Sequence, residues 1–416
     1  DDYRKRNGLL KADFTWDMIP FDIMQEYAAY DAVCTFLLYE KFKSAIDKSE
    51  RFTSVYKNIL LPATEFLLDV ENNGVPFDEE RLYKSSELMQ EDIDNAVKSL
   101  YDFTEVKVFE EAQSKPFNPN STVQLRSLLF DYIGLKPTGK KTGTGADSTD
   151  AEVLTTLAKQ HEVPALILDI RQKVKIKSTY LDKIIPALDR DSRLRTGFNL
   201  HGTTSGRLSS SGKMNMQQIP RDNPIVKGCI KAKPGNKIVA MDLTTAEVYC
   251  AAVLADDKAL MKVFQDGGNF HSNIAKLVFN LPCEVDQVAE YYATERQMAK
   301  AVTFGIMYGA GPKKISEQVS KDSGTYFSTS EAKEVIEDYF KQFHRLKKWL
   351  DDSKTLIEKQ AYLYSFFGRK RRLPNVKSTD KAIAAHEVRS GINALVQSVA
   401  SDVNLLGAID AHREVT

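Results

Sequence analysis

The sequence lacks several features that would each point to a particular class of protein. Its 416 residues contain four cysteines, which are far apart and form no metal-ligand spacing with one another. We therefore expect free thiols, and neither a disulfide framework nor a zinc site. No apolar run approaches the length of a membrane span, and the opening Asp-Asp-Tyr-Arg-Lys-Arg is not a signal peptide. These absences predict a soluble, intracellular protein that has no membrane partner.

Net charge is also lacking, because 57 Lys and Arg residues balance 57 Asp and Glu residues. The chain as a whole therefore offers no electrostatic field that would attract nucleic acid, and any such surface must come from local clusters of cations. One cluster is the run Arg-Lys-Arg-Arg at residues 369–372, which is either a solvated basic turn or a phosphate contact. The length allows about two to four domains.

The most informative feature that is present is a ladder of four side chains on one predicted helix. Arg296, Lys300, Phe304 and Tyr308 recur at intervals of four, so they share one helix face. This face spans about 18 Å at about 1.5 Å per residue. Two cations at one end suit a triphosphate, and two aromatic rings at the other suit a base or sugar. From the pattern alone, an ordinary amphipathic helix whose rings face a core is the alternative.

Helix start signals occur at two places near candidate functional residues. Thr294 followed by Gln297 predicts a capping box at the start of the ladder helix. Thr244 followed by Glu247 predicts another, which would give Glu247 a structural role. Both expectations depend on side chains that fold back onto the first turn of their own helix.

An acidic residue follows a short apolar run that we predict to be a strand. Residues 238–241 lead into Asp242, and an apolar helix follows. A carboxylate at this position, with the backbone carbonyl of Leu243 beside it, is a suitable hard-oxygen ligand for Mg²⁺. Phosphoryl transfer commonly uses two such ions about 3.5–4 Å apart.

Helix and loop signals organise the rest of the chain. Gly74 is expected to close one helix and Asp78 to cap the next, which runs through Leu100. Further helices are expected at residues 124–132 and at about 150–160, and short strands with polar loops from Arg193 onward. A final helix carries a polar stripe that is costly to bury unless its members are paired; the stripe comprises Arg389, Asn393 and Gln397.

The ladder resembles the finger-helix motif of family A DNA polymerases, in which Arg, Lys, Phe or Tyr, and Tyr-Gly follow one another at intervals of four. Residues 203–220 resemble a second motif of that family, with Gln218 where Asn is usual. Residues 242–249 resemble a third in divergent form, because Leu243, Thr245 and Tyr249 replace the family's Tyr, Gln and Arg. The resemblance extends from Tyr27 to Asp402, which is nearly the whole chain.

The resemblance implies an α+β, predominantly helical fold of the right-hand polymerase type. Such a fold has a thumb, a palm with an antiparallel sheet, and fingers, here preceded by a remnant of an exonuclease domain. The implied ranges are 1–48 (C-terminal end of the 3′–5′ exonuclease domain), 49–190 (thumb), 191–255 (first part of the palm), 256–364 (fingers) and 365–416 (truncated return to the palm).

The resemblance also implies roles for individual residues. Asp242 and Lys300 would be catalytic, and Asp242 with the Leu243 carbonyl would bind metal. Glu247 would crowd the 2′ position of the incoming sugar. The implied nucleotide-binding residues are Arg296, Lys300, Phe304, Tyr308, His271 and Glu247. The implied DNA-binding residues are Arg207, Asn215, Gln217, Arg369, Arg389, Asn393 and Gln397. Tyr27 and Asp31 would be half of a proofreading exonuclease site.

The function implied is template-directed DNA polymerisation, with primer-template DNA and dNTPs as partners and two Mg²⁺ ions as cofactors. The resemblance also implies a monomer in the cytoplasm of a bacterial or phage-infected cell. The divergent Asp242 segment suggests a phage or metagenomic source. No His-Asp-Glu tripeptide, which carries the family's second catalytic acid, occurs after residue 230, so we expect a fragment. A single-subunit RNA polymerase shares the ladder, although Glu247, Phe304 and the exonuclease remnant argue against it. A DNA-holding protein without chemistry is the other alternative.

Overall fold

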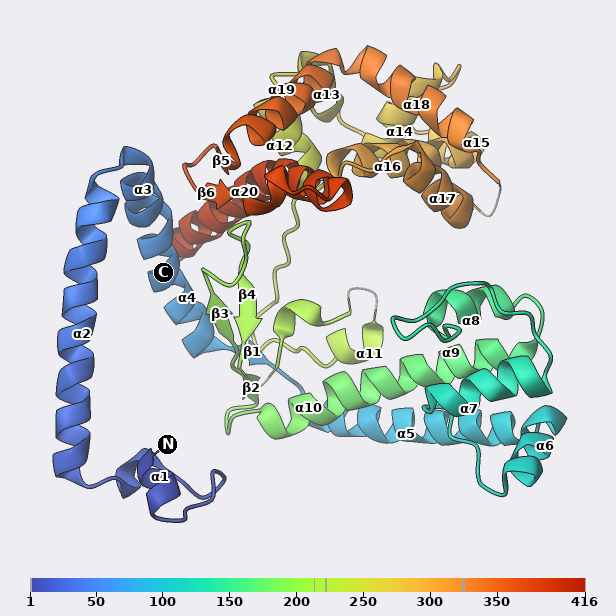
Figure 1. Cartoon of the computed structure of the whole chain (residues 1–416), viewed down its shortest axis with the longest axis horizontal. Helices are drawn as coiled ribbons and strands as arrows, with labels where there is room; N and C mark the ends of the chain where they lie inside the picture. Colours follow the sequence, from blue (N-terminus) through green and yellow to red (C-terminus); the bar gives the residue numbers. More distant parts are fainter. Residues whose placement is uncertain (1, 213, 221–222, 324–325, 416) are drawn as a thin grey trace. The chain divides into compact units, whose positions relative to one another are not determined.

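The computed structural model describes residues 2–212, 214–220, 223–323 and 326–415 (Figure 1). Lys213, which belongs to the motif at residues 203–220, lies outside them. The chain divides into two compact units. Unit 1 comprises Asp1–Phe66, Leu200–Arg207 and Leu243–Thr416, and unit 2 comprises Leu67–Asn199 and Leu208–Asp242. Helices dominate the described residues, as the sequence predicts.

Unit 2 is a helical body with short strands at one end. Its helical elements are α5 (Glu79–Tyr101), α6 (Thr104–Gln113), α7 (Thr122–Ser127), η3 (Leu128–Tyr132), α8 (Ala151–Leu157), α9 (Glu162–Lys175), η4 (Ile176–Leu181), α10 (Asp182–Ile184), η5 (Ile185–Ala187), η6 (Met216–Gln218) and α11 (Pro224–Lys227). Helix α5 buries one apolar face that includes Leu82, Met89 and Leu100, and it packs against α9. The predicted helices at 79–100, 124–132 and 150–160 are thus confirmed.

The predicted junction at Gly74 and Asp78 is also confirmed. Gly74 closes α4 (Leu61–Asn73) with a φ of +61°, and a Cβ there would lie 3.0 Å from the carbonyl oxygen of Leu194. Only glycine fits such a position without strain. The Asp78 carboxylate accepts a hydrogen bond from the backbone N–H of Arg81 and so caps α5.

The strands form small antiparallel pairs. In unit 2, β1 (Val75–Pro76) pairs with β2 (Arg193–Leu194), and β3 (Gly197–Asn199) pairs with β4 (Ser209–Ser211). In unit 1, β5 (Tyr362–Tyr364) pairs with β6 (Lys370–Arg372). The strand predicted at residues 238–241 is wrong: the structure assigns that run no strand. Val239 and Met241 are 78% and 83% exposed, and a strand cannot form without a neighbour to pair with.

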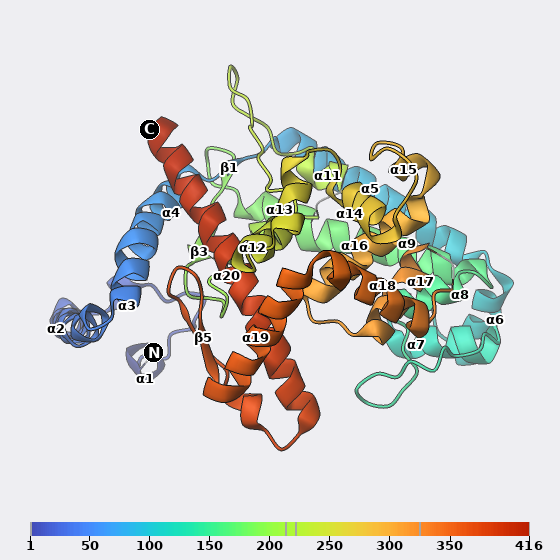
Figure 2. The ribbon, with the colours of Figure 1, turned by 90° about the horizontal axis from the view of Figure 1, so that it is seen from above.

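Unit 1 contains the remaining helices. They are α1 (Asp2–Arg6), η1 (Trp16–Met18), α2 (Phe21–Asp47), α3 (Glu50–Val55), η2 (Tyr56–Leu60), α12 (Ala246–Leu254), α13 (Lys258–Gln265), α14 (Phe270–Phe279), α15 (Val288–Tyr291), α16 (Ala293–Met307), α17 (Pro312–Ser323), α18 (Thr329–Gln342), α19 (His344–Gln360), η7 (Pro374–Lys377) and α20 (Lys381–Val415). Helices α12 to α19 and α20 are drawn in Figure 2, and all of α12 to α19 and part of α20 contribute residues to one apolar core. Every residue of α2 is outside the core.

Helix α20 is the one described helix that is long and apolar enough to cross a membrane, judged by length and composition alone. It also has a buried inner face, which includes Val396, Leu405 and the fully buried Asp402. This face packs within unit 1 against α12 and α19. The long helix predicted to carry the polar stripe is therefore confirmed as an element.

Candidate functional site

Helix α16 carries the ladder and has two distinct faces. Ala299, Val302 and Ile306 are buried in the core of unit 1. Arg296 and Phe304 are half-buried, and Lys300 is exposed. The helix is therefore an ordinary packed helix on one side, and its ladder lies on the other, more open side.

The capping box predicted for α16 is wrong. The helix begins at Ala293, because the carbonyl oxygen of Tyr292 accepts a hydrogen bond from the backbone N–H of Arg296. Thr294 consequently lies inside the first turn, and the Gln297 amide donates to Asp322 instead of folding back. Arg296 remains in the first turn, as expected.

Tyr308 lies directly after the end of α16, where it is the C-terminal cap residue. A hollow of about 270 Å³ extends along the ladder from there. Lys300, Phe304 and Tyr308 line it from the ladder, and Ile315 and Gln318 line it from α17. The ladder thus borders a space that is lined by two aromatic rings, by Lys300 and Lys314, and by the carboxylate of Asp322.

His271 lies at the cationic end of the ladder. It is in the first turn of α14, and its ring centroid lies 5.6 Å from that of Phe304. Burial, together with the positive charges of Lys300 and Arg296, lowers the pKa of His271 to about 4. The imidazole is therefore neutral at neutral pH, and its buried Nδ1 has no hydrogen-bond partner among the described residues.

Arg296 lies beside the same helix start. Its Nη2 donates to the Asn269 side-chain oxygen at 3.4 Å, and that oxygen also accepts from the backbone N–H of Ser272 to cap α14. Within the described part of the chain, the buried Nε of Arg296 has no hydrogen-bond partner. Arg296, Lys300 and the start of α14 together make an electropositive corner, which is a suitable environment for a polyanion. Asn269 was not predicted, although an Asn just before a helix is a recognisable cap signal.

Glu247 joins the aromatic end of the ladder to a loop far away in sequence. The Tyr308 hydroxyl donates to Glu247 Oε2 at 2.6 Å, and Arg207 Nη2 donates to Glu247 Oε1. Burial and the hydrogen bond to Glu247 raise the pKa of Tyr308 to about 12. The phenol therefore remains a donor, and the Glu247 carboxylate is fixed at both oxygens.

The capping box predicted for Glu247 is also wrong. Helix α12 begins at Ala246, and Thr245 precedes it in the left-handed region with a φ of +50° and no side-chain cap. A β-branched residue is strained in this conformation, so surrounding contacts must hold it there. The Glu247 side chain is only 16% exposed and is committed to Arg207 and Tyr308.

The loop that presents Arg207 is held by a buried ion pair. Arg369 donates from Nε to both oxygens of Asp402 at 3.0 Å and from Nη2 at 2.8 Å. Gly206 packs directly on Arg369, because a Cβ there would lie 2.8 Å from its Nε. Thr203 Oγ1 donates to the Arg207 carbonyl oxygen at 2.7 Å, which closes the loop. Arg369 was predicted to bind DNA; its guanidinium is engaged by Asp402, and the DNA role stays a prediction.

The polar stripe of α20 begins beside the end of the ladder. Gly309 packs on Arg389, because a Cβ at Gly309 would lie 2.9 Å from Arg389 Cγ. Asn393 is half-buried, and its buried side-chain oxygen finds no hydrogen-bond partner in the residues that the structure describes. Gln397 follows on the same face and is also half-buried. The structure thus brings Arg389 next to the site, while DNA contacts by the stripe remain a prediction.

Asn215 and Gln217 belong to unit 2, where they shape the chain after β4. Asn215 Oδ1 accepts from the backbone N–H of Gln217 at 3.0 Å and caps η6. Gln217 Nε2 donates to the Leu208 carbonyl oxygen, and its side-chain oxygen accepts from Ser210 Oγ. These amides are therefore engaged in local hydrogen bonds.

The metal-binding prediction rests on Asp242, which is exposed. Its carboxylate and the Leu243 carbonyl are hard oxygens of the kind that Mg²⁺ prefers. Among the described residues, however, no group of three or more His, Cys, Asp or Glu side chains could hold a metal ion. The donor set there is too small for the two-ion site. Tyr27 and Asp31, the other predicted half-site, lie together on α2, and the negative charge of Asp31 raises the pKa of Tyr27.

Known proteins are similar to this chain over most of its length. The family model described as DNA polymerase family A matches residues 85–416. The DNA polymerase of Escherichia phage T5 is 48% identical over 432 aligned positions, which cover 100% of this chain and 50% of the relative. The thermostable DNA polymerase I of Thermus aquaticus is 32% identical over 92% of this chain and 44% of the relative.

A solved structure is similar as well. The POL domain of Pol1 from M. smegmatis, in complex with DNA primer-template and dNTP, has a TM-score of 0.75 and 26% identity, and the match covers 89% of this chain and 62% of that one. The chain spans about half the length, or less, of the curated relatives described above.

Proposed function

The chain belongs to DNA polymerase family A, and on this premise we propose that it acts in template-directed DNA synthesis, adding deoxyribonucleoside triphosphates to a primer 3′-hydroxyl. The observation that carries the proposal is that the ladder on α16 combines a cationic end with an aromatic end. Its cationic end has unfilled donor capacity at Arg296 and His271, and its aromatic end is fixed to Glu247 through Tyr308. A nucleoside triphosphate presents both a polyanion, which the cations can bind, and a flat base, which can lie along the rings.

We assign the residues of the site the following roles. Arg296 and Lys300 bind the triphosphate, and Lys300 stabilises the negative charge that develops during transfer. His271 is neutral and can donate one hydrogen bond to a phosphate oxygen. The base and sugar lie along Phe304 and Tyr308, with the Glu247 carboxylate at the 2′ position.

Arg207 has a positioning role toward Glu247 in this proposal. Its guanidinium holds one carboxylate oxygen while Tyr308 holds the other, so the carboxylate has little freedom to swing aside. A 2′-hydroxyl would meet this fixed group, which favours deoxyribose over ribose. This arrangement supports a DNA polymerase over the RNA polymerase alternative.

Members of this family generally require a divalent metal ion, and we propose Mg²⁺ as that ion with Asp242 as one ligand. When bound, the metal would supply Lewis-acid stabilisation of the phosphates. The described residues provide too few ligands for it, so we derive no further step through the ion.

The partners proposed are a primer-template DNA and a dNTP, which are also what the similar Pol1 structure contains. Arg207, Asn215, Gln217, Arg369, Arg389, Asn393 and Gln397 are proposed DNA contacts. The similar proteins come from a phage and from bacteria, so we place the protein in the cytoplasm of a bacterial or phage-infected cell, as a monomer.

Primer extension with the complete natural protein tests the proposal. The parent should extend a radiolabelled primer on a template in the presence of Mg²⁺ and the templated dNTP only. Asp242→Asn should abolish extension, because it removes a metal ligand, and should leave primer-template binding in a gel shift largely intact. If the parent binds DNA without extending it, the non-catalytic alternative holds; extension by Asp242→Asn at the parent rate removes Asp242 from the mechanism.

A further inference from the structure

The Arg207 side chain can hold Glu247 only as firmly as its own loop is held. Arg207 donates a hydrogen bond to the Glu247 carboxylate, yet its side chain is 48% exposed. A long and exposed side chain stays in one place only where its backbone is fixed, because every rotatable bond otherwise lets the guanidinium move away. The contacts that fix the backbone next to Arg207 therefore also fix Glu247.

Two consecutive residues of α20, Ser401 and Asp402, reach the residue that directly precedes Arg207. Ser401 Oγ donates to the carbonyl oxygen of Gly206 at 3.3 Å, although the two residues are 195 positions apart in the sequence. Asp402 reaches Gly206 indirectly, through the guanidinium of Arg369. All of these residues belong to unit 1. One turn of α20 thus holds the loop by two separate routes.

The contact between Gly206 and Arg369 leaves little room for movement. Gly206 has a φ of +82°, and a Cβ there would lie 2.8 Å from Nε and 3.0 Å from Cζ of Arg369. A glycine both permits this backbone conformation and lets the guanidinium lie directly against the chain. The loop therefore cannot shift toward Arg369, and it follows any displacement of that side chain.

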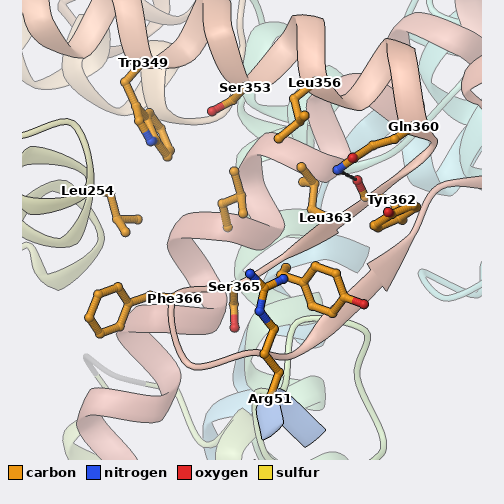
Figure 3. Close-up of a pocket in the computed structure, with 12 residues that line it drawn as sticks. Arg51, Leu254, Trp349, Ser353, Leu356, Gln360, Tyr362, Leu363, Ser365 and Phe366 are labelled. Atoms are coloured by element: carbon orange, nitrogen blue, oxygen red, sulfur yellow. Dashed lines mark hydrogen bonds between the residues drawn. The ribbon is translucent and has the colours of Figure 1, made fainter. Parts of the chain in front are cut away.

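Arg369 is itself fixed through its backbone and its side chain. Its backbone N–H donates to Ser365 Oγ at 3.1 Å, and its carbonyl oxygen accepts from the Ser365 N–H at 2.9 Å. Ser365 directly follows β5 and is drawn in Figure 3. The guanidinium is 17% exposed and is bound by both oxygens of Asp402. It is therefore a rigid surface on which Gly206 rests.

Stability alone is a weak reason for this ion pair. Asp402 is fully buried, and burial raises the pKa of its carboxyl group against the opposite effect of Arg369. Removing a charge from water costs free energy, and replacing a buried ion pair with well-packed apolar groups is often neutral or stabilising. Two hydrogen-bonded carboxylate oxygens do, however, fix the direction of a guanidinium more strictly than apolar contacts can. The geometry suits an orienting role.

We propose that Asp402 and Ser401 are positioning residues for the Glu247 carboxylate, and hence for the selection of deoxyribose. They act at a distance, through the loop at residues 203–207. Once this loop is loosened, the carboxylate can swing aside, and a 2′-hydroxyl then meets a movable group instead of a fixed one. The inference rests on the proposed function in placing Glu247 at the sugar.

Single-nucleotide competition on one primer-template, with the complete protein, measures the effect. Ser401→Ala should raise the ratio of ribonucleotide to deoxyribonucleotide incorporation about 2-fold to 10-fold, the range that corresponds to one ordinary hydrogen bond. Asp402→Asn keeps the shape of the side chain, removes its charge, and should raise the ratio as well. Ser330→Ala and Asp352→Asn are the matched controls, because they make the same changes at exposed positions of α18 and α19, and both should behave like the parent.

The same two changes in a Glu247→Ala background separate positioning from a general effect. No carboxylate is then left to position, so neither change should raise the ratio further. A further rise of equal size would overturn the proposal, because Ser401 and Asp402 would then act by another route. An unchanged ratio for both variants in the parent background, with a lower thermal midpoint, would also overturn it, because the ion pair would then serve stability alone.

A second measurement requires no catalysis. 3-Fluorotyrosine in place of Tyr308 reports by ¹⁹F NMR on the hydrogen bond that this hydroxyl donates to Glu247. Ser401→Ala and Asp402→Asn should move the resonance toward its position in Glu247→Ala, where the bond is absent, and Ser330→Ala should leave it in place. If Glu247→Ala left the incorporation ratio unchanged, the proposed role of Glu247 at the sugar would be wrong, and the resonance would still report on positioning. A resonance that neither variant moves would overturn the positioning itself.

Discussion

Replacing Glu247 with alanine should relax selection against ribonucleotides in primer extension. In the structure both carboxylate oxygens are fixed, one by Tyr308 and the other by Arg207, and the side chain is 16% exposed. We propose that the Glu247 carboxylate lies where the 2′-hydroxyl of a ribonucleotide would be. The fixed carboxylate therefore excludes the 2′-hydroxyl sterically, and Glu247→Ala removes this steric exclusion.

The expected change in the incorporation ratio follows from the small size of the excluded hydroxyl group. A pocket that rejects one extra small group discriminates by about 1–3 kcal/mol, which corresponds to about 10-fold to 200-fold. Glu247→Ala should raise the ratio of ribonucleotide to deoxyribonucleotide incorporation by an amount in this range. Single-nucleotide competition on one primer-template, with the products separated by electrophoresis, measures the ratio directly.

Glu247→Gln is the matched control. Glutamine keeps the bulk and can still accept the Tyr308 hydrogen bond, so its ratio should stay close to that of the parent. If glutamine raised the ratio as much as alanine, charge and not bulk would be responsible. If alanine left the ratio unchanged while lowering the thermal midpoint, Glu247 would be structural and its assignment to the sugar should be withdrawn.

Two further predictions concern the ladder and its neighbour. Phe304→Tyr should increase acceptance of dideoxynucleotides, because a new hydroxyl can replace the hydrogen bond lost with the 3′-hydroxyl; an unchanged ratio of dideoxynucleotide to deoxynucleotide incorporation would contradict this. His271 has a pKa of about 4 in the folded chain against 6.5 as its ordinary value, so its stabilising contribution is complete above pH 6.5 and is lost as pH falls toward 4. His271→Gln should therefore lose less thermal stability between pH 7 and pH 4.5 than the parent, and parallel curves would show that His271 does not titrate in this way.

Local features of the fold could be predicted from the sequence because their causes are local. Gly74 and Asp78 act on the adjacent helix ends, so their residue types reveal their roles. The ladder could be predicted for the same reason, since the spacing of Arg296, Lys300 and Phe304 defines a helix face without reference to any other segment.

Features that depend on distant partners could not be predicted. Glu247 bonds to a tyrosine 61 residues away and to an arginine 40 residues away, and these partners compete successfully with the local capping box. The Gln297 side chain likewise donates a hydrogen bond to Asp322 and does not cap its own helix. The strand predicted at residues 238–241 fails because an apolar run becomes a strand only where a neighbour pairs with it. Arg369 and Asp402 are 33 residues apart, so their ion pair could not be predicted from the sequence. Arg369 was predicted only to bind DNA.

The most direct test of the central claim is single-turnover primer extension by the complete protein with Lys300→Ala. Because Lys300 is proposed to stabilise charge on the transferring phosphates, its loss should lower the maximal rate by about 10²-fold to 10³-fold while primer-template affinity is retained. Arg296→Ala should mainly raise the dNTP concentration needed for half-maximal rate. Lys333→Ala, at an exposed lysine of α18 in the same unit, is the matched control and should behave like the parent. A parent-like maximal rate in Lys300→Ala would contradict the account, because α16 would then be a packed helix with no role in nucleotide transfer.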